Sequence, residues 1–173
     1  QAGQIFVQAI SAAGIPGVPV STSFDKFFDY VKADNRDWKV SATSVEQSEG
    51  QVRNAVDGNP ATYWHTNWSG SRERHPHELN IDFGKSLNVV GIRYLPRQDM
   101  TNGRIGRYNI KVSTDGQNWS EVNQGSFENT DQWQRKMFEI TQSARFLKLT
   151  ALSEVSREYY TSLAELEVLV TGD

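Results

Sequence analysis

Short segments of alternating apolar and polar residues dominate the chain from about residue 39 onward. Alternation with a period of two predicts strands with one buried face, clearest over residues 79–83, 90–94, 108–112, 147–151 and 164–170. A weaker pattern covers 39–44, and Asp115-Gly116 predicts a hairpin turn. About eight short strands, with no helix of core length between them, predict an all-β fold: an antiparallel β-sandwich or jelly roll.

The first 36 residues follow a different pattern. Residues 4–10 and 18–24 are two possible strands separated by a break that contains glycine and proline. Helical spacing predicts a short amphipathic helix that ends near residue 34, carried by Phe24, Phe27, Phe28 and Val31. We interpret residues 1–36 as the tail of a preceding domain or a linker, and residues 37–173 as the main domain. Because the chain begins with glutamine, we expect it to be a piece of a larger protein.

Composition narrows the possible functions. Net charge is −3 with both signs interspersed, which predicts neither nucleic-acid binding nor an anionic membrane as partner. No apolar run approaches the roughly 18 residues of a membrane span. The absence of cysteine excludes disulfides, zinc-thiolate sites and cysteine nucleophiles, and no catalytic motif stands out. We expect a binding module and not an enzyme.

The five tryptophans give a prediction about the core. Trp68 could belong to the core or to the rim of the site, and the core is expected to contain Trp38, Trp64, Trp119 and Trp133.

The stretch N-A-V-D-G-N-P-A-T-Y-W-H-T-N-W, residues 54–68, has the most informative chemistry. Oxygen donors stand at i, i+2 and i+5 in Asp57, Asn59 and Thr62, while an intervening glycine and proline curl the backbone. Donors that are all oxygen suit a hard cation such as Ca²⁺. The alternative is an ordinary Asx turn that binds no ion.

Four further motifs follow this stretch: Y-L-P-R-Q-D at 94–99, V-S-T-D-G-Q-N-W at 112–119, A-R-F-L-K-L at 144–149 and A-E-L-E-V at 164–168. Together the five motifs resemble, in the same order, the discoidin-like domains, which are also called coagulation factor 5/8 type C domains. Among these the sequence is most similar to carbohydrate-binding module family 32, whose members are attached to bacterial glycosidases. The resemblance covers about residues 37–171.

The resemblance implies a structural Ca²⁺. Its ligands would be the carboxylates of Asp57 and Glu165, the hydroxyl and carbonyl of Thr62, and the carbonyls of Asn54, Asn59 and Ala164. One feature of the sequence supports this independently: Glu165 has the opposite parity to Leu166 and Val168, so its side chain is free to leave the core face. The alternative for Glu165 is a solvated strand residue.

The resemblance also implies a site for galactose-type sugars, built by His65, Arg97 and Asn102. Their donors and acceptors suit sugar hydroxyls, which donate and accept at once. The family adds an acidic acceptor, for which Glu46 fits best and Glu49 is the reserve, and an aromatic ring that stacks on the sugar, for which we expect Tyr160 and, second, Tyr159. Without the resemblance, the histidine could be a packed core residue and the arginine an ordinary surface charge.

The expected ligand is a glycan that ends in galactose or N-acetylgalactosamine, and N-acetylglucosamine is the next choice for the terminal sugar. The resemblance further implies a monomeric module that targets a glycoside hydrolase domain of the same chain to glycan-rich surfaces. Its location would be secreted, periplasmic or on a bacterial cell surface. A discoidin-type adhesion or lipid-binding domain is the alternative, with Met100 as the lone candidate for membrane insertion. A plain structural spacer is the third possibility.

Overall fold

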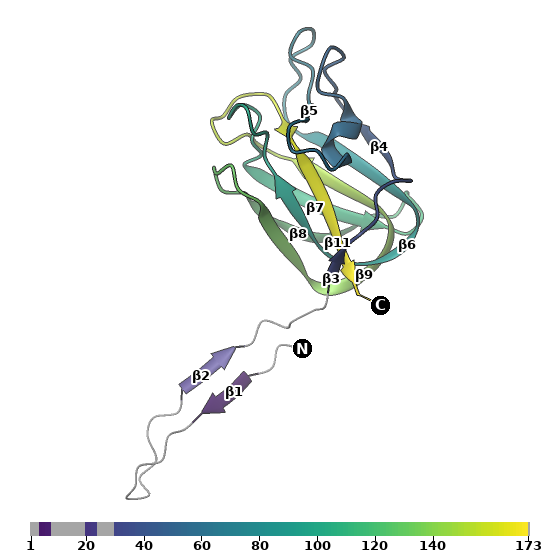
Figure 1. The fold of residues 1–173 in the computed structure, drawn as a ribbon, viewed down its shortest axis with the longest axis vertical. Coiled ribbons are helices and arrows are strands. Elements are labelled where there is room, and N and C mark those ends of the chain that lie inside the picture. Colours follow the sequence, from purple (N-terminus) through teal and green to yellow (C-terminus); the bar gives the residue numbers. More distant parts are fainter. Residues whose placement is uncertain (1–3, 8–19, 24–29, 173) are drawn as a thin grey trace, which may run out of the picture.

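The computed structural model describes residues 4–7, 20–23 and 30–172, and it confirms the predicted all-β, antiparallel sandwich (Figure 1). The strands are β1 (Gln4–Val7), β2 (Val20–Ser23), β3 (Tyr30–Lys32), β4 (Lys39–Ala42), β5 (Trp64–His65), β6 (His77–Leu95), β7 (Arg107–Ser113), β8 (Ser120–Ser126), β9 (Gln134–Ala151), β10 (Ser162–Leu163) and β11 (Glu165–Thr171). Among the described residues the helical element is the 3-10 turn η1 (Val52–Val56), which sequence patterning did not predict.

The two long strands, β6 and β9, connect the layers of the sandwich. The hydrogen-bonded order is β3-β11-β6-β9-β7-β8, with β4 beside β6. The first half of β6 pairs with β4 and its second half with β11, and the register to β9 shifts between Asp82 and Leu87. Gly84 lies at this shift with a φ of 76°, a left-handed conformation that glycine adopts at little cost. The segments 79–83 and 90–94 are therefore one bent strand and not two.

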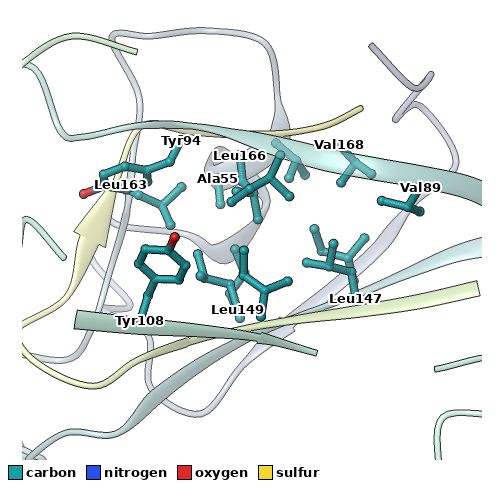
Figure 2. Packing of buried hydrophobic residues seen from close by; sticks show 14 of the residues in the cluster. Ala55, Val89, Tyr94, Tyr108, Leu147, Leu149, Leu163, Leu166 and Val168 are labelled. Carbon is teal, nitrogen blue, oxygen red and sulfur yellow. The ribbon is translucent and has the colours of Figure 1, made fainter. Parts of the chain in front are cut away.

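Alternating residues of the two layers meet in the core (Figure 2). Tyr94, Leu166 and Val168 approach from one layer, and Tyr108 and Leu149 approach from the other. All five are nearly inaccessible to solvent. Each fully buried side chain of this size stabilises the fold by about 1.5–3 kcal/mol, before the cost of ordering the chain. The strand parity read from the sequence is confirmed at these positions.

The tryptophan predictions are correct in part. Trp38 and Trp64 belong to the core. Trp119 and Trp133 do not: both are half-buried and covered by cations, with Lys148 Nζ 4.8 Å from the Trp119 ring centroid and the Arg93 guanidinium 4.4 Å from that of Trp133. Both follow turns, where strand parity no longer tells which way a side chain points.

Within the N-terminal segment, the described residues contradict part of the predicted helix. Residues 24–29 lie outside the described residues, and 30–32 form β3, which pairs with the edge of β11. At Val31 the backbone forms hydrogen bonds to β11 instead of a helical turn. The helix prediction rested only on the spacing of four apolar side chains. The division at residues 36 and 37 stays a prediction, although β3 lies before it and joins the sheet. β1 and β2 pair with each other inside the two predicted strand segments.

None of the helical structure in the described residues is long and apolar enough to cross a membrane.

Candidate functional site

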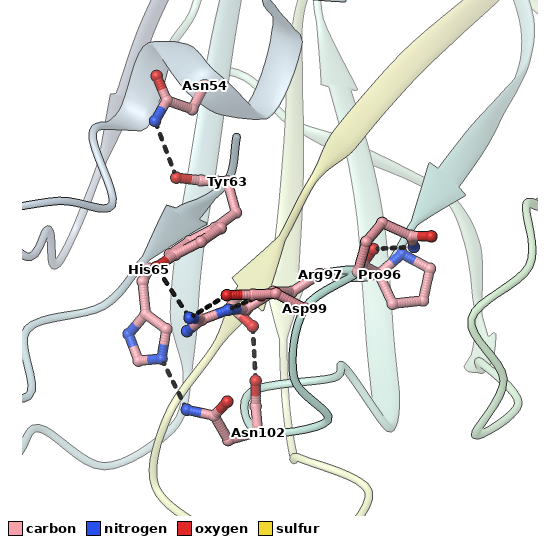
Figure 3. Close-up of polar contacts among 9 residues, drawn as sticks. Asn54, Tyr63, His65, Pro96, Arg97, Asp99 and Asn102 are labelled. Carbon is pink, nitrogen blue, oxygen red and sulfur yellow. Dashed lines mark hydrogen bonds and ion pairs between the residues drawn. The ribbon is translucent and has the colours of Figure 1, made fainter. Parts of the chain in front are cut away.

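Four of the predicted sugar-site residues come together around the short β5–β10 pair. Figure 3 shows three of them, His65, Arg97 and Asn102. His65 lies on β5 opposite Ser162 of β10. The loop that follows β6 carries Arg97 and Asn102, and it is joined to β10 because the Ser162 hydroxyl donates to the Asn102 carbonyl at 2.7 Å. Tyr160 lies just before β10, with its ring centroid 5.7 Å from that of His65. Segments far apart in the sequence thus converge on the His65 imidazole.

The hydrogen bonds of His65 fix the tautomer that we assign to it. Nδ1 lies 2.6 Å from the Thr66 carbonyl oxygen, which can only accept, so Nδ1 carries the proton and Nε2 keeps its lone pair. Burial lowers the pKa of His65, and the positive charge of Arg97 adds to the effect, so the ring is neutral at pH 7. The amide nitrogen of Asn102 lies 3.4 Å from Nε2, while its amide oxygen has no partner. Nε2 and the Asn102 amide nitrogen thus pair with each other, and the Asn102 oxygen is a buried acceptor without a donor.

Arg97 is held by two residues that the sequence did not single out. Its guanidinium lies 3.7 Å above the centroid of the Tyr63 ring. Nη2 donates to the Tyr63 hydroxyl at 2.8 Å and to Asp99 Oδ2 at 2.9 Å, and Nε donates to Asp99 Oδ1 at 2.5 Å. The hydrogen bond from Arg97 also lowers the pKa of Asp99. Within the described residues Nη1 has no hydrogen-bond partner, so this rigid fork still offers donors to a ligand.

A sequence signal existed for one of these two supporting residues. Asp99 stands two positions after Arg97 inside the same Y-L-P-R-Q-D motif, at a spacing that suits a local ion pair. Tyr63 gave no such signal, because a tyrosine beside Trp64 is equally compatible with the core. Its contact with Arg97 depends on how β5 lies against the loop after β6, which only the fold reveals.

Glu46, the first choice for the acidic acceptor, bonds to neighbouring groups of the protein itself. Its carboxylate is buried and accepts hydrogen bonds from the backbone nitrogens of Trp68 and Ser69, both at 3.0 Å, and from the Ser69 and Ser48 hydroxyls. These bonds, led by that from Trp68, lower the pKa of Glu46 to about 2. Both oxygens are occupied, so Glu46 supports the loop that presents Trp68, whose side chain is exposed.

The reserve candidate, Glu49, has an exposed side chain. Burial raises the pKa of Tyr63, and the negative charge of Glu49 adds to that effect. The same charge acts on His65 and Arg97. Glu49 therefore lies within electrostatic reach of the site, and its carboxylate belongs to no ion pair among the residues described.

The two tyrosines before β10 point in different directions. Tyr160 approaches His65, whereas Tyr159 is 40% exposed and lies under the guanidinium of Arg74, 4.5 Å from its ring centroid. Only Tyr160 is therefore placed to stack on a sugar held by His65. Tyr159 contributes to a different surface.

A buried polar cluster holds the Tyr160 segment against β5. The Thr161 hydroxyl lies 3.1 Å from His75 Nε2 and 2.9 Å from His77 Nδ1. The backbone of Thr161 is bonded in turn to Thr66, through its nitrogen to the Thr66 hydroxyl at 3.0 Å and through its carbonyl to the Thr66 nitrogen at 2.9 Å. Burial lowers the pKa of both histidines, that of His75 to about 4, so the cluster is uncharged at pH 7.

We expect Gly50→Ala to damage the site. Gly50 has a φ of 86°, and a Cβ there would lie 2.8 Å from His65 Cβ. Left-handed strain and this contact together should cost about 1–3 kcal/mol of unfolding free energy and displace His65. Thermal unfolding and galactose titration measure the two effects. Gly84→Ala is the matched control, because Gly84 has a φ of 76° with nothing within 4 Å. Equal losses in both variants would contradict a steric role at His65.

The predicted cation ligands also come together, where the loop after η1 approaches β11. The Thr62 hydroxyl donates to Asp57 Oδ2 at 2.7 Å, and the Gly58 nitrogen donates to Glu165 Oε1 at 2.7 Å. Glu165 is buried, and its second oxygen, Oε2, has no partner. Burial, together with the neighbouring Asp57, raises the pKa of Glu165 to about 7. Two carboxylates forced together around an unpartnered oxygen are the arrangement that a bound cation would stabilise.

Of the remaining predicted ligands, Asn54 lies on η1 and Asn59 in the loop after it, whereas Ala164 lies between β10 and β11. The Asn59 carbonyl accepts from the Thr62 hydroxyl at 2.9 Å, and the Asn54 amide fixes the loop by donating to the Tyr63 carbonyl at 3.1 Å. Ala164 is fully buried beside Glu165. The described residues contain no group of three or more His, Cys, Asp or Glu side chains suited to a metal ion. A cation here would therefore depend on two carboxylates and on hydroxyl and carbonyl oxygens, a donor set that suits Ca²⁺.

Comparison with known proteins places this geometry in context. The F5/8 type C domain model matches residues 39–166. Among solved structures, the family 32 module of NanJ from Clostridium perfringens, in complex with galactose, is 31% identical with a TM-score of 0.74 and covers 81% of this chain and 98% of its own. The module CpGH89CBM32-5 from the same organism, in complex with GalNAc-β-1,3-galactose, is 30% identical with a TM-score of 0.74, covering 80% and 99%.

Two curated relatives are much longer proteins. A sialidase of Micromonospora viridifaciens is 35% identical over 131 residues, which are 75% of this chain and 20% of the relative. A galactose oxidase of Gibberella zeae is 39% identical over 134 residues, which are 76% of this chain and 19% of the relative. The chain thus spans about a fifth of the length of these relatives.

Proposed function

Because the chain belongs to the F5/8 type C domain family and is similar to solved family 32 carbohydrate-binding modules, we propose that it binds glycans ending in galactose or N-acetylgalactosamine. The observation that carries the proposal is the convergence of His65, Arg97, Asn102 and Tyr160 on one place. The galactose-containing complexes of two relatives support the choice of sugar.

Each side chain has a distinct role in this proposal. Arg97 donates from Nη1 to sugar oxygens, because Asp99 and Tyr63 already occupy its other nitrogens. His65 accepts a sugar hydroxyl at Nε2, where the hydroxyl replaces the Asn102 amide nitrogen, and the displaced Asn102 amide then donates to or accepts from the sugar. Tyr160 covers the apolar face of the ring and excludes water from its C–H groups. A shallow site of this kind binds a monosaccharide at about millimolar to micromolar Kd.

The proposal includes a structural Ca²⁺ in the loop beside the sugar site. Asp57 and Glu165 would supply its negative ligands, with the Thr62 hydroxyl and the carbonyls of Asn54, Asn59, Thr62 and Ala164 completing the set. The ion would offset the repulsion between the two carboxylates and fix the loop that leads to His65. It has no part in contacting the sugar.

In its whole protein, the module would act through proximity. We propose a glycoside hydrolase as the catalytic partner in the same chain, secreted or displayed at a bacterial surface, as the similarity to a longer sialidase suggests. A weak module tethered to an enzyme raises the local concentration of substrate without taking part in the chemistry.

Calorimetric titration with galactose, N-acetylgalactosamine, N-acetylglucosamine and glucose tests the proposal. We expect the first two sugars to bind, N-acetylglucosamine to bind more weakly, and glucose to bind weakest. Co-sedimentation with anionic lipid vesicles should show no binding. Vesicle binding in the absence of any response to the sugars would instead support the lipid-binding alternative.

The pH dependence of galactose affinity follows from the lowered pKa of His65. Protonation would convert the Nε2 acceptor into a donor beside the Arg97 cation, so affinity should be lost as pH falls through that pKa. Because the pKa lies below the usual 6.5, affinity should stay constant from pH 8 to 6.5 and fall only in more acidic solution. Titrations at several pH values measure this. A midpoint at or above 6.5 would show that His65 does not bind the sugar as a neutral ring.

A further inference from the structure

A second groove lies on the other side of the segment that carries Tyr160. Its volume is about 750 Å³, within the range of ligand sites. Arg74, Arg107, Arg157 and Tyr159 line it, together with the exposed Leu152. None of these residues has a part in the galactose site.

The charges of this groove are unbalanced. Arg74, Arg107 and Arg157 are exposed, and none forms an ion pair or a side-chain hydrogen bond with the described residues. The acidic residues in the lining are Glu154 and Glu158. Glu154 is buried, and its Oε2 accepts from the backbone nitrogens of Ser156 and Glu158 at 2.5 and 3.1 Å. It therefore holds the loop, and Glu158 is the exposed negative charge. Three guanidinium groups against two carboxylates leave the lining with an excess of one positive charge.

The groove wall is fixed in place. Val155 donates its backbone N–H to the Arg104 carbonyl at 3.0 Å, and Gly106 donates to the Ser153 carbonyl at 2.7 Å. Arg157 has a φ of 67°, a left-handed conformation that costs a residue with a Cβ free energy and that persists only where the surroundings impose it. The loop thus holds this arginine at the groove although its backbone is strained there.

The two sites share one wall. Tyr160 approaches His65, and its neighbour in the chain, Tyr159, lies in the groove under Arg74. Successive Cα atoms are about 3.8 Å apart, so a glycan whose terminal sugar lies beside Tyr160 can reach over the backbone into the groove with its next residue.

We propose that this groove is a second subsite, which binds an acidic sugar, one that bears a carboxylate or a sulfate ester, next to the terminal galactose. The inference rests on the proposed function for the position of the first sugar. Arg107 and Arg157 would donate to the anion, since a guanidinium fork matches both carboxylate and sulfate oxygens. Arg74 and Tyr159 would form the platform for the sugar ring. The module would then prefer acidic glycans to neutral ones with the same terminal sugar.

Calorimetric titration with matched disaccharides tests the proposal. The neutral probes are lactose and N-acetyllactosamine. The acidic probes are galactosyl-glucuronic acid, which carries a carboxylate, and N-acetyllactosamine 6-sulfated on its glucosamine. We expect each acidic probe to bind about fivefold more tightly than its neutral counterpart at 50 mM salt, with a smaller advantage at 300 mM. An advantage for one probe alone identifies the anion.

The double variant Arg107→Ala/Arg157→Ala should lose this advantage and keep its affinity for lactose. Arg36→Ala, which removes a surface arginine paired with Asp34, should retain the advantage. Equal binding of acidic and neutral probes, no binding of any probe, or an advantage that survives the double variant would each overturn the proposal. If acidic probes bind through these arginines while lactose does not bind at all, the second subsite stands and the galactose assignment fails.

Discussion

Arg97→Ala is expected to weaken galactose binding by about 10- to 100-fold, because a hydrogen bond to a charged group contributes about 1.5–3 kcal/mol. The variant also leaves Asp99 and the Tyr63 hydroxyl without their shared partner, so the ring that supports the sugar pocket loses its orientation. From a millimolar starting affinity, such a loss makes binding undetectable by calorimetry. Arg97→Lys should recover little, since the Asp99 oxygens and the Tyr63 hydroxyl would use all three donors of an ammonium group and leave none for the ligand.

Arg145→Ala is the matched control for this variant. Arg145 also contacts an aspartate through two nitrogens, donating to Asp82 at 2.8 and 3.0 Å, but it lies on β9 away from the site. Thermal unfolding of both variants separates loss of folding from loss of binding. Wild-type galactose affinity in folded Arg97→Ala would remove Arg97 from the sugar site.

Removal of Ca²⁺ is expected to lower the melting temperature by about 5–10 °C. Saturation at about 100 times the Kd stabilises a protein by about 2.7 kcal/mol, and each kcal/mol shifts the Tm by about 2–4 °C in a domain of this size. Without the ion, Asp57 and Glu165 repel each other, and Glu165 Oε2 stays unpartnered. Calorimetric or fluorescence melting curves with Ca²⁺ and with a chelator measure the difference.

Two substitutions on β11 make this result specific to the proposed ligands. Glu165→Gln should unfold at the same temperature with and without Ca²⁺, because it removes a charged ligand. Glu167→Gln should keep the full Ca²⁺ response, since Glu167 is paired with Lys32 and Arg93 instead. A wild-type Tm that does not respond to the chelator, or an undiminished response in Glu165→Gln, would contradict the cation site.

The sequence predicted those parts of the fold that depend on local pattern. Alternation at residues 108–112 gave the parity of β7, and Asp115-Gly116 gave the turn to β8, because both signals lie within a few residues. It did not predict that β6 continues past Gly84, since that depends on pairing with β9 across the bend. Nor did it predict β3, whose pairing with β11 bridges more than a hundred residues.

The same distinction between local and long-range information applies to the candidate site. Motif resemblance located His65, Arg97, Asn102 and Tyr160, which the structure brings together. Its choice of Glu46 as the acidic acceptor stays a prediction. Nothing local distinguishes Glu46, whose carboxylate holds the loop at Trp68 and Ser69, from the reserve candidate Glu49, which is exposed. The sequence also did not predict the groove beside Tyr159, because its arginines are far apart in the chain: Arg107 lies on β7, and Arg74 and Arg157 lie in two separate loops.

A crystal structure of the chain with bound galactose tests the central claim most directly. The account predicts one sugar between His65 and the loop after β6, with hydroxyls bonded to His65 Nε2, Arg97 and Asn102 and with Tyr160 against its apolar face. Galactose bound on another surface, with these four side chains free of contacts to it, would contradict the account.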